Sequence, residues 1–219
     1  MTRSNNDAPS VAKKKSGGRA KALSSSGVAQ NNRQDMGQRL RAIRKAHKLT
    51  LLLLSQRSGV ALSTLSKMEL GQVSISYEKF VAVAKALGVD VSRLFDADAP
   101  DNQARAPTFV HSIIAESPGY LSDQYHHRML AADYPRKYME PLYSKILARE
   151  ETEFADYIRH TGQEFCMVLS GVLRICFETG ERVTLKRTES LYFDSGIGHK
   201  YLSVGKADAE VVVVMSEGN

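Results

Sequence analysis

The stretch TLLLLSQRSGVALSTLSKMELG, residues 50–71, decides the fold of the N-terminal half of this 219-residue chain. Its apolar residues recur at a spacing of three to four on both sides of Gly59, as in two short amphipathic helices. Thr50 is a favourable N-cap residue for the first helix, and Gly71 is a favourable residue to end the second. Ser55 is small where the helices would touch, and Gly59 allows the positive φ of a tight turn. The stretch therefore predicts a helix-turn-helix.

The helical pattern continues on both sides of this motif. Met36, Leu40 and Ile43 share one face of a preceding helix, and two further helices are expected over residues 76–87, ended by Gly88, and 91–95. Five short helices between residues 35 and 96 would form a compact all-α domain.

Two segments show no helix or strand pattern. Residues 1–34 are rich in Ser, Asn, Gln, Gly, Ala and Lys and contain no aromatic residue, so we expect a disordered basic tail. Residues 97–107 contain two prolines and no apolar face, which is typical of a linker.

From residue 108 to residue 219 the pattern changes to short alternating runs separated by turn signals. The expected strands are residues 109–114, 125–132, 142–148, 154–158, 165–169, 172–177, 182–185, 191–193, 200–204 and 210–215. So many short strands in about 110 residues favour one antiparallel sandwich or barrel. The fold class is thus multidomain, with an all-α domain before an all-β domain. We expect Phe154, Phe165, Tyr192 and Tyr201 in the β core.

The charge is divided along the chain. Residues 1–34 hold seven Lys and Arg against one Asp, residues 35–97 hold ten against five acids, and residues 98–219 hold thirteen against eighteen. A basic front half favours a polyanionic partner, and an acidic back half favours a different task. The sequence shows no apolar run long enough to span a membrane and begins with a polar segment, so we expect a cytoplasmic protein. Cys166 and Cys176 are expected to be reduced core residues.

Residues 36–95 closely resemble the helix-turn-helix domain of the phage-repressor-like (XRE) family. That resemblance implies that the helix after the turn enters the major groove of double-stranded DNA, and that a homodimer covers two half-sites. The positions it places nearest the bases and phosphates are Ala61, Leu62, Ser63, Thr64 and Lys67. The residues expected to contact the DNA backbone are Arg41, Arg44 and Thr50. The run of leucines from Leu51 to Leu53 departs from the usual polar pattern, so at least one should be exposed.

A second cluster begins at Ile158-Arg159-His160-Thr161-Gly162-Gln163-Glu164. A histidine and a carboxylate four residues apart can converge on one ion, and His199 on a later strand would complete the face. Residues 108–216 resemble a cupin domain, in which His160, Glu164 and His199 occupy three of four ligand positions and Ile158 replaces the first histidine. The resemblance implies either one divalent metal (Fe, Zn, Mn or Ni) or a metal-free effector pocket that these residues line. The third alternative is that the histidines are only structural. His126 and His127 alternate on a strand, so only one can point inward.

Two functions fit these features. The main hypothesis is a sequence-specific transcriptional regulator whose cupin domain senses a small-molecule effector. The alternative is a mononuclear non-haem iron oxygenase or epoxidase with a repressor-like N-terminal domain, because residues 160–164 also resemble the hydroxypropylphosphonate epoxidases. The sequence identifies neither the effector nor the operator.

Overall fold

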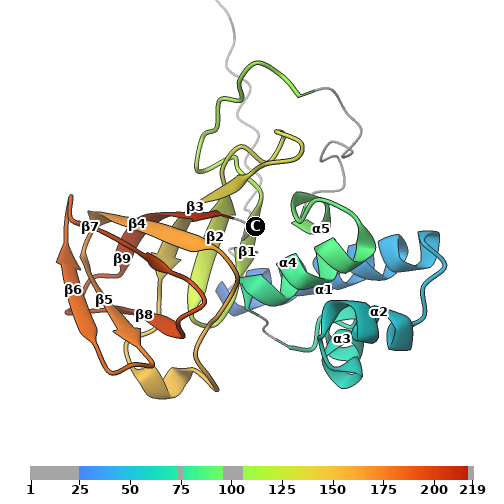
Figure 1. Cartoon of the computed structure of the whole chain (residues 1–219), viewed down its shortest axis with the longest axis horizontal. Coiled ribbons are helices and arrows are strands. Elements are labelled where there is room, and N and C mark those ends of the chain that lie inside the picture. The colour runs from blue at the N-terminus through green and yellow to red at the C-terminus, as the bar shows by residue number, and fades with distance from the viewer. Residues whose placement is uncertain (1–24, 74–75, 96–105, 217–219) are drawn as a thin grey trace, which may run out of the picture.

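The computed structural model describes residues 25–73, 76–95 and 106–216. Within them, the helices are α1 (Ser25–Ala46), α2 (Leu51–Ser58), α3 (Leu62–Glu69), α4 (Tyr77–Leu87) and α5 (Ser92–Phe95). The helices gather on one side of the molecule and the strands on the other (Figure 1). None of the described helices is long and apolar enough to cross a membrane.

The helix-turn-helix has the local geometry that its sequence predicts. The side chain of Thr50 caps α2 by accepting a hydrogen bond of 3.1 Å from the backbone N–H of Leu53. Gly59 ends α2 with a left-handed φ of 70°, and the Ser55 hydroxyl donates to the carbonyl of Val60 across the turn at 2.7 Å. The expected end of α3 is also confirmed, since Gly71 has a φ of 63°. These contacts fix the angle between α2 and α3.

Helix α1 begins ten residues earlier than the boundary expected at Asp35, inside the segment assigned to the tail. Extending an existing helix is much easier than nucleating one, because each further residue adds a hydrogen bond. A long-range contact supports the extension, since Arg33 lies 3.3 Å from the carboxylate of Asp123 in the β domain. The remaining tail, residues 1–24, and most of the expected linker, residues 96–105, lie outside the described residues.

The β domain is antiparallel throughout, as expected. Its strands are β1 (Gly119–Leu121), β2 (Tyr125–Met129), β3 (Met139–Ile146), β4 (Gln163–Ser170), β5 (Val172–Phe177), β6 (Arg182–Lys186), β7 (Ser190–Asp194), β8 (His199–Ser203) and β9 (Ala209–Ser216). One sheet has the order β1-β2-β3-β9-β4-β7 and the other the order β6-β5-β8. Leu142, Ile146, Cys166, Leu173 and Val211 are buried in the core of this domain.

Two of the expected strands are absent from the described residues, and one observed strand was not expected. Residues 109–114 form no strand, and Phe109 is 78% exposed, so its apolar run does not mark a core element. In the segment 154–158 only Ile158 pairs, as an isolated bridge to His199. Strand β1 begins at Gly119, the last residue of the Ser117-Pro118-Gly119 turn signal, and it exists because β2 offers an edge to pair with.

Aromatic side chains join the two domains. The rings of Phe80 and Phe95 lie 5.0 and 5.9 Å from that of Tyr120 on β1, measured between centroids. Tyr77, at the start of α4, lies 6.0 Å from the ring of His127 on β2. The buried residues of both domains form one hydrophobic cluster, so α4 belongs to two cores at once.

Arg44 forms a partly buried ion pair inside the helical domain. Its guanidinium contacts the Glu69 carboxylate at 2.5 and 3.0 Å and donates to the carbonyl of Leu49 at 2.6 Å. The two charged side chains are only 11% and 6% exposed. The guanidinium of Arg44 is thus held by Glu69, and the expected contact of Arg44 with the DNA backbone stays a prediction.

Replacing Arg44 by Ala should lower the free energy of unfolding of the helical domain by about 3 kcal/mol, because it leaves a buried carboxylate without its partner. Urea unfolding followed by circular dichroism at 222 nm measures the change. Arg41→Ala, on the exposed side of the same helix, is the matched control and should change the value by less than about 0.5 kcal/mol. Equal losses of unfolding free energy in the two variants would show that the Arg44–Glu69 pair does not stabilise the helical domain more than an exposed arginine does.

Candidate functional site

The first candidate site is the outer face of the helix-turn-helix. The exposed positions include Arg41, Thr50, Ala61, which is the N-cap of α3, and the first two residues of α3, Leu62 and Ser63. Lys67 is exposed one turn further along α3, whereas Thr64 is partly buried. The structure thus leaves most of the expected contact positions open on one helix and its flanks.

The prediction that at least one leucine from Leu51 to Leu53 is exposed is confirmed. Leu52 is 60% exposed and Leu53 is 36% exposed, whereas Leu54 is fully buried. Leu62 on α3 is a further exposed leucine, at 47%. Apolar side chains therefore lie beside the polar contact positions of this face.

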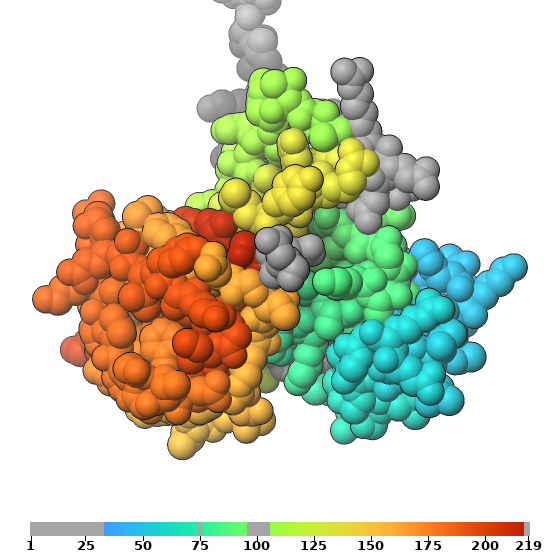
Figure 2. Space-filling view, viewed as in Figure 1, coloured from blue at the N-terminus to red at the C-terminus, as the bar shows by residue number. Residues whose placement is uncertain are grey.

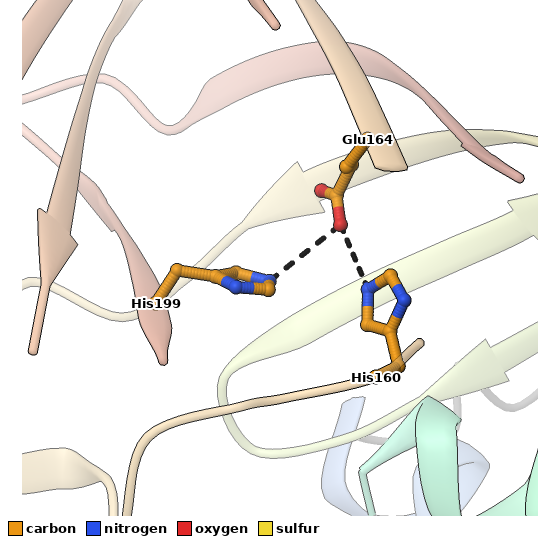
Figure 3. Close-up of side chains that lie close together, drawn as sticks. All are labelled: His160, Glu164 and His199. Atoms are coloured by element: carbon orange, nitrogen blue, oxygen red, sulfur yellow. Dashed lines mark hydrogen bonds and ion pairs between the residues drawn. The ribbon is translucent and has the colours of Figure 1, made fainter. Parts of the chain in front are cut away.

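The second candidate site is a cluster of two histidines and one glutamate in the β domain (Figure 3). His160 lies in the loop before β4, Glu164 is on β4, and His199 begins β8. The same oxygen of Glu164, Oε2, lies 2.9 Å from Nε2 of His160 and 3.5 Å from Nε2 of His199. The possible ligand atoms of all three residues lie within 4.8 Å of one another, so the group could hold a metal ion.

Backbone contacts bring these three residues together from separate segments. Ile158 and His199 exchange two backbone hydrogen bonds of 3.0 Å, and the N–H of His160 donates to the carbonyl of Ser195 at 3.0 Å. Gly198 permits this approach, because a Cβ there would lie 2.8 Å from the Cβ of Tyr157. The apolar segment 154–158 therefore serves to position His160, although it forms no strand.

Neighbouring groups hold the cluster in one orientation. The Nδ1 atom of His199 lies 2.9 Å from the carbonyl of Ile197. If Nδ1 carries the proton and donates a hydrogen bond to this carbonyl, Nε2 is unprotonated and its lone pair faces Glu164. The other Glu164 oxygen accepts a hydrogen bond from the hydroxyl of Tyr201, and the Tyr201 N–H donates to the hydroxyl of Tyr125 at 3.1 Å.

Burial and mutual contact shift the titration of the cluster. Burial alone would raise the pKa of Glu164, but the hydrogen bond with His160 and the nearby His199 hold it below its ordinary value. Burial alone would lower the pKa of His160, but the hydrogen bond with Glu164 and the charges of Glu164 and Glu78 raise it. Burial lowers the pKa of His199. The carboxylate is therefore ionised, and one imidazole is more basic than the other.

A cavity of about 60 Å³ adjoins the cluster. Ile158 lines it at the position where the cupin resemblance places a fourth ligand, so that wall is apolar. His127 also lines it and lies 2.7 Å from the Ser144 hydroxyl, whereas His126 does not line it, which confirms that only one of the two points inward. Burial lowers the pKa of His127 to about 4, so it is neutral near pH 7.

Sequence reasoning missed part of this site. Tyr201 is buried as expected, but it also binds Glu164, and Tyr125 was not singled out. The expectation that Tyr192 is a core residue is wrong, because it is 62% exposed on the edge strand β7. Phe154 and Phe165 are partly buried, and both cysteines are buried free thiols. The one signal in the sequence that could have identified Tyr201 is its position two residues after His199.

The donor set indicates what the cluster can do. Two imidazoles and one carboxylate on one side of an ion leave its remaining positions open, as in Fe(II) sites, and the same ligands suit Zn, Mn or Ni. The arrangement can therefore hold a divalent metal without a fourth protein ligand, even though Ile158 offers none.

We expect the protein to bind Zn(II) and Fe(II), and we expect Glu164→Gln and His199→Ala each to lower that affinity at least about 100-fold by removing a ligand. Competition with a chromogenic chelator measures the affinity, and His126→Ala, outside the cluster, is the control. The metal affinity should be highest at pH values above the raised pKa of His160. As the pH is lowered, the affinity should begin to fall above pH 6.5, the ordinary pKa of histidine, because a protonated imidazole cannot ligate a metal. Wild-type protein that takes up neither ion at pH 8 contradicts this expectation.

Comparison with known proteins follows the same division of the chain. The helix-turn-helix family model matches residues 40–94, and the cupin-domain family model matches residues 147–215. No curated protein sequence gave a match. Among solved structures, the chain is similar to an HTH_3 family transcriptional regulator from Vibrio cholerae, with 18% sequence identity, a TM-score of 0.56, and coverage of 85% of this chain and 98% of that one. It is also similar to hydroxypropylphosphonic acid epoxidase from S. wedmorenis, with 19% identity, a TM-score of 0.44, and coverage of 85% and 99%.

The first of these structural likenesses shows a shared fold. The two family matches lie on the two parts that the structure separates, since residues 40–94 span the helices up to α5 and residues 147–215 span β4 to β9. The chain therefore carries a helix-turn-helix domain that is followed by a cupin domain.

Proposed function

We propose that this protein binds a pseudo-palindromic DNA operator as a homodimer and that a small-molecule effector bound by its cupin domain changes the affinity for that operator. The observation that carries the proposal is the exposed face of α3, which presents Ser63 and Lys67 beside a capped and correctly turned α2. A single helix-turn-helix covers one half-site, so two copies are needed for a full operator. As a partner of the chromosome, the protein acts in the cytoplasm.

Each exposed position has a role in this proposal. Ala61, Leu62, Ser63, Thr64 and Lys67 face the major groove, where Lys67 contacts guanine or a phosphate and the small and apolar side chains meet base edges. Arg41 and Thr50 contact the DNA backbone and fix the register. Thr64, which is partly buried, has the least freedom of the five groove residues.

The rest of the chain is assigned accordingly. Residues 35–96 form the DNA-binding domain, and residues 108–219 form the sensor domain. The basic segment of residues 1–34, whose last ten residues belong to α1, adds a salt-sensitive attraction to phosphates, and residues 97–107 connect the two domains. The contact between α4 and the β domain gives a physical route by which the sensor acts on the helices.

One observation favours a second candidate function. The cluster of His160, Glu164 and His199 is a two-histidine, one-carboxylate face of the kind used by iron-dependent oxygenases. Oxygen consumption by the iron-loaded protein with a substrate, lost in Glu164→Gln, would favour an iron oxygenase or epoxidase. Iron binding without oxygen consumption, together with tight operator binding, favours the regulator.

Replacing Lys67 by Ala should weaken operator binding by about tenfold and, if Lys67 contacts a phosphate, reduce the slope of log affinity against log salt concentration by about one. The operator is first selected from a random DNA pool with wild-type protein, and fluorescence anisotropy then gives the affinities. Lys186→Ala, a matched change on β6 far from α3, should leave both quantities unchanged.

The dimer is tested separately by gel filtration with light scattering at micromolar concentration. A dimer is expected, with two protomers on each operator. A monomer both with and without DNA contradicts the proposed mode of binding, and so does the absence of any enriched sequence after selection.

A further inference from the structure

Helix α3 carries an exposed leucine at the end where the proposed function places the DNA bases. Leu62, the first residue of the helix, is 47% exposed, and its neighbours Ala61 and Ser63 are exposed as well. The buried residues of α3 are Leu65, Met68 and Glu69. Leu62 thus presents apolar surface outside the core of its own domain.

This surface is open to a large partner. Figure 2 shows α2 and α3, in cyan, on the side of the molecule away from the later strands of the β domain, which are orange and red. Because Leu62 keeps nearly half of its surface exposed, no part of the described chain covers it. A second macromolecule can therefore reach the side chain without any movement of the two domains.

The charge of the same surface favours a polyanion as that partner. Residues 50–71 contain two basic residues, Arg57 and Lys67, and both are exposed. The one acidic residue in this range, Glu69, is buried against Arg44, with its side chain 6% exposed. The helix-turn-helix therefore turns no free carboxylate toward a phosphate backbone, and its exposed charges are positive.

The side chains of α3 limit the ways in which it can recognise a base. Bidentate hydrogen bonds to adenine use Asn or Gln, and those to guanine use Arg or Lys. Residues 61–69 contain no Asn, Gln or Arg, and their single lysine, Lys67, lies five residues after Leu62. In a helix-turn-helix the N-terminal residues of the second helix contact the base edges. The first turn of α3 therefore meets the bases with hydroxyl and apolar groups alone.

One group in the major groove suits an apolar side chain. Thymine presents its C5 methyl group there, whereas adenine, guanine and cytosine are distinguished by hydrogen-bond donors and acceptors. Leucine forms no side-chain hydrogen bond, so against those polar edges Leu62 would displace water from a polar atom without replacing its hydrogen bond. Against a thymine methyl group, both partners bury apolar surface.

We propose that Leu62 contacts the C5 methyl group of a thymine in the major groove, so that each operator half-site has an A·T base pair at this position. This inference rests on the proposed function, since it names a base that the second helix of the motif selects. The two half-sites have the same base pair because two copies of α3 contact them.

Replacement of thymine by deoxyuridine tests the contact, because it removes the methyl group and leaves the base pairing unchanged. The operator is first selected from a random DNA pool with wild-type protein, and each thymine is then replaced in turn. At one position we expect the affinity of the wild type, measured by fluorescence anisotropy, to fall about fourfold per half-site, the effect of one buried methyl group. The same replacement should leave the affinity of Leu62→Ala unchanged.

Leu70→Ala is the matched control for this comparison. Leu70 is 49% exposed, but it is the C-cap at the opposite end of α3. This variant should be as sensitive to deoxyuridine as the wild type. The proposal is wrong if no thymine position affects the wild type, or if Leu62→Ala is as sensitive as the wild type at every position. Either result assigns the exposed leucine to a partner other than a base.

A second measurement uses only wild-type protein and so does not depend on the folding of a variant. The thymine is replaced by cytosine or by 5-methylcytosine, each paired with guanine, so that the two operators differ only in the methyl group. The wild type should bind the 5-methylcytosine operator about fourfold more tightly per half-site than the cytosine operator. Equal affinities for the two operators contradict the proposal.

The salt dependence distinguishes a methyl contact from a phosphate contact. Burial of a methyl group releases no counterion, so Leu62→Ala should lower the operator affinity without changing the slope of log affinity against log salt concentration. Lys67→Ala, if Lys67 contacts a phosphate, reduces that slope by about one. A slope that falls equally in Leu62→Ala would show that this variant disturbs the backbone contacts and would overturn the assignment.

The DNA selection separates this inference from the proposed function. Protein that selects an operator without thymine in its half-sites, or one that is insensitive to deoxyuridine, refutes the Leu62 contact and leaves the regulator standing. Protein that enriches no DNA sequence refutes the regulator, and the Leu62 contact is refuted with it.

Discussion

The packing of α4 against the β domain is the contact on which the rest of the structure depends. Phe80 and Phe95 meet Tyr120, and Tyr77 meets His127, so the two domains share one apolar cluster. Burial of aromatic side chains is the largest favourable contribution available to such an interface. Because α4 is held from both sides, the same contact positions the helix-turn-helix and closes one side of the histidine cluster's cavity.

The histidine cluster depends on this architecture in a second way. His160 belongs to no strand, and its position comes from backbone hydrogen bonds to Ser195 and from the bridge between Ile158 and His199. Glu164 remains ionised while buried because both imidazoles and the Tyr201 hydroxyl face it. A buried carboxylate without such partners would take up a proton. The cluster is thus a preformed group of side chains that could hold a metal ion, and the surrounding backbone fixes its geometry.

Local signals in the sequence predicted the helical domain well. Four residues act on their immediate neighbours, by capping a helix or by adopting a positive φ, and each has the predicted role: Thr50, Gly59, Gly71 and Gly88.

The β domain was predicted less accurately at its edges. Strand β1 depends on pairing with β2, and Tyr192 is exposed because β7 lies at the edge of its sheet. An alternating pattern alone does not show which strands lie at an edge.

The sequence by itself determined the order of the two domains and the turn and caps of the helix-turn-helix, because these follow from short-range chemistry. It indicated the three clustered residues through their resemblance to the cupin pattern. Only the tertiary structure decided how individual side chains are used. It paired Arg44 with Glu69, brought Tyr201 to Glu164, and left the hydroxyl of Tyr77 without a hydrogen-bond partner among the residues that the structure describes. These outcomes join residues at least 25 positions apart or depend on the contact between two domains, and neither kind of contact leaves a periodic signal in the sequence.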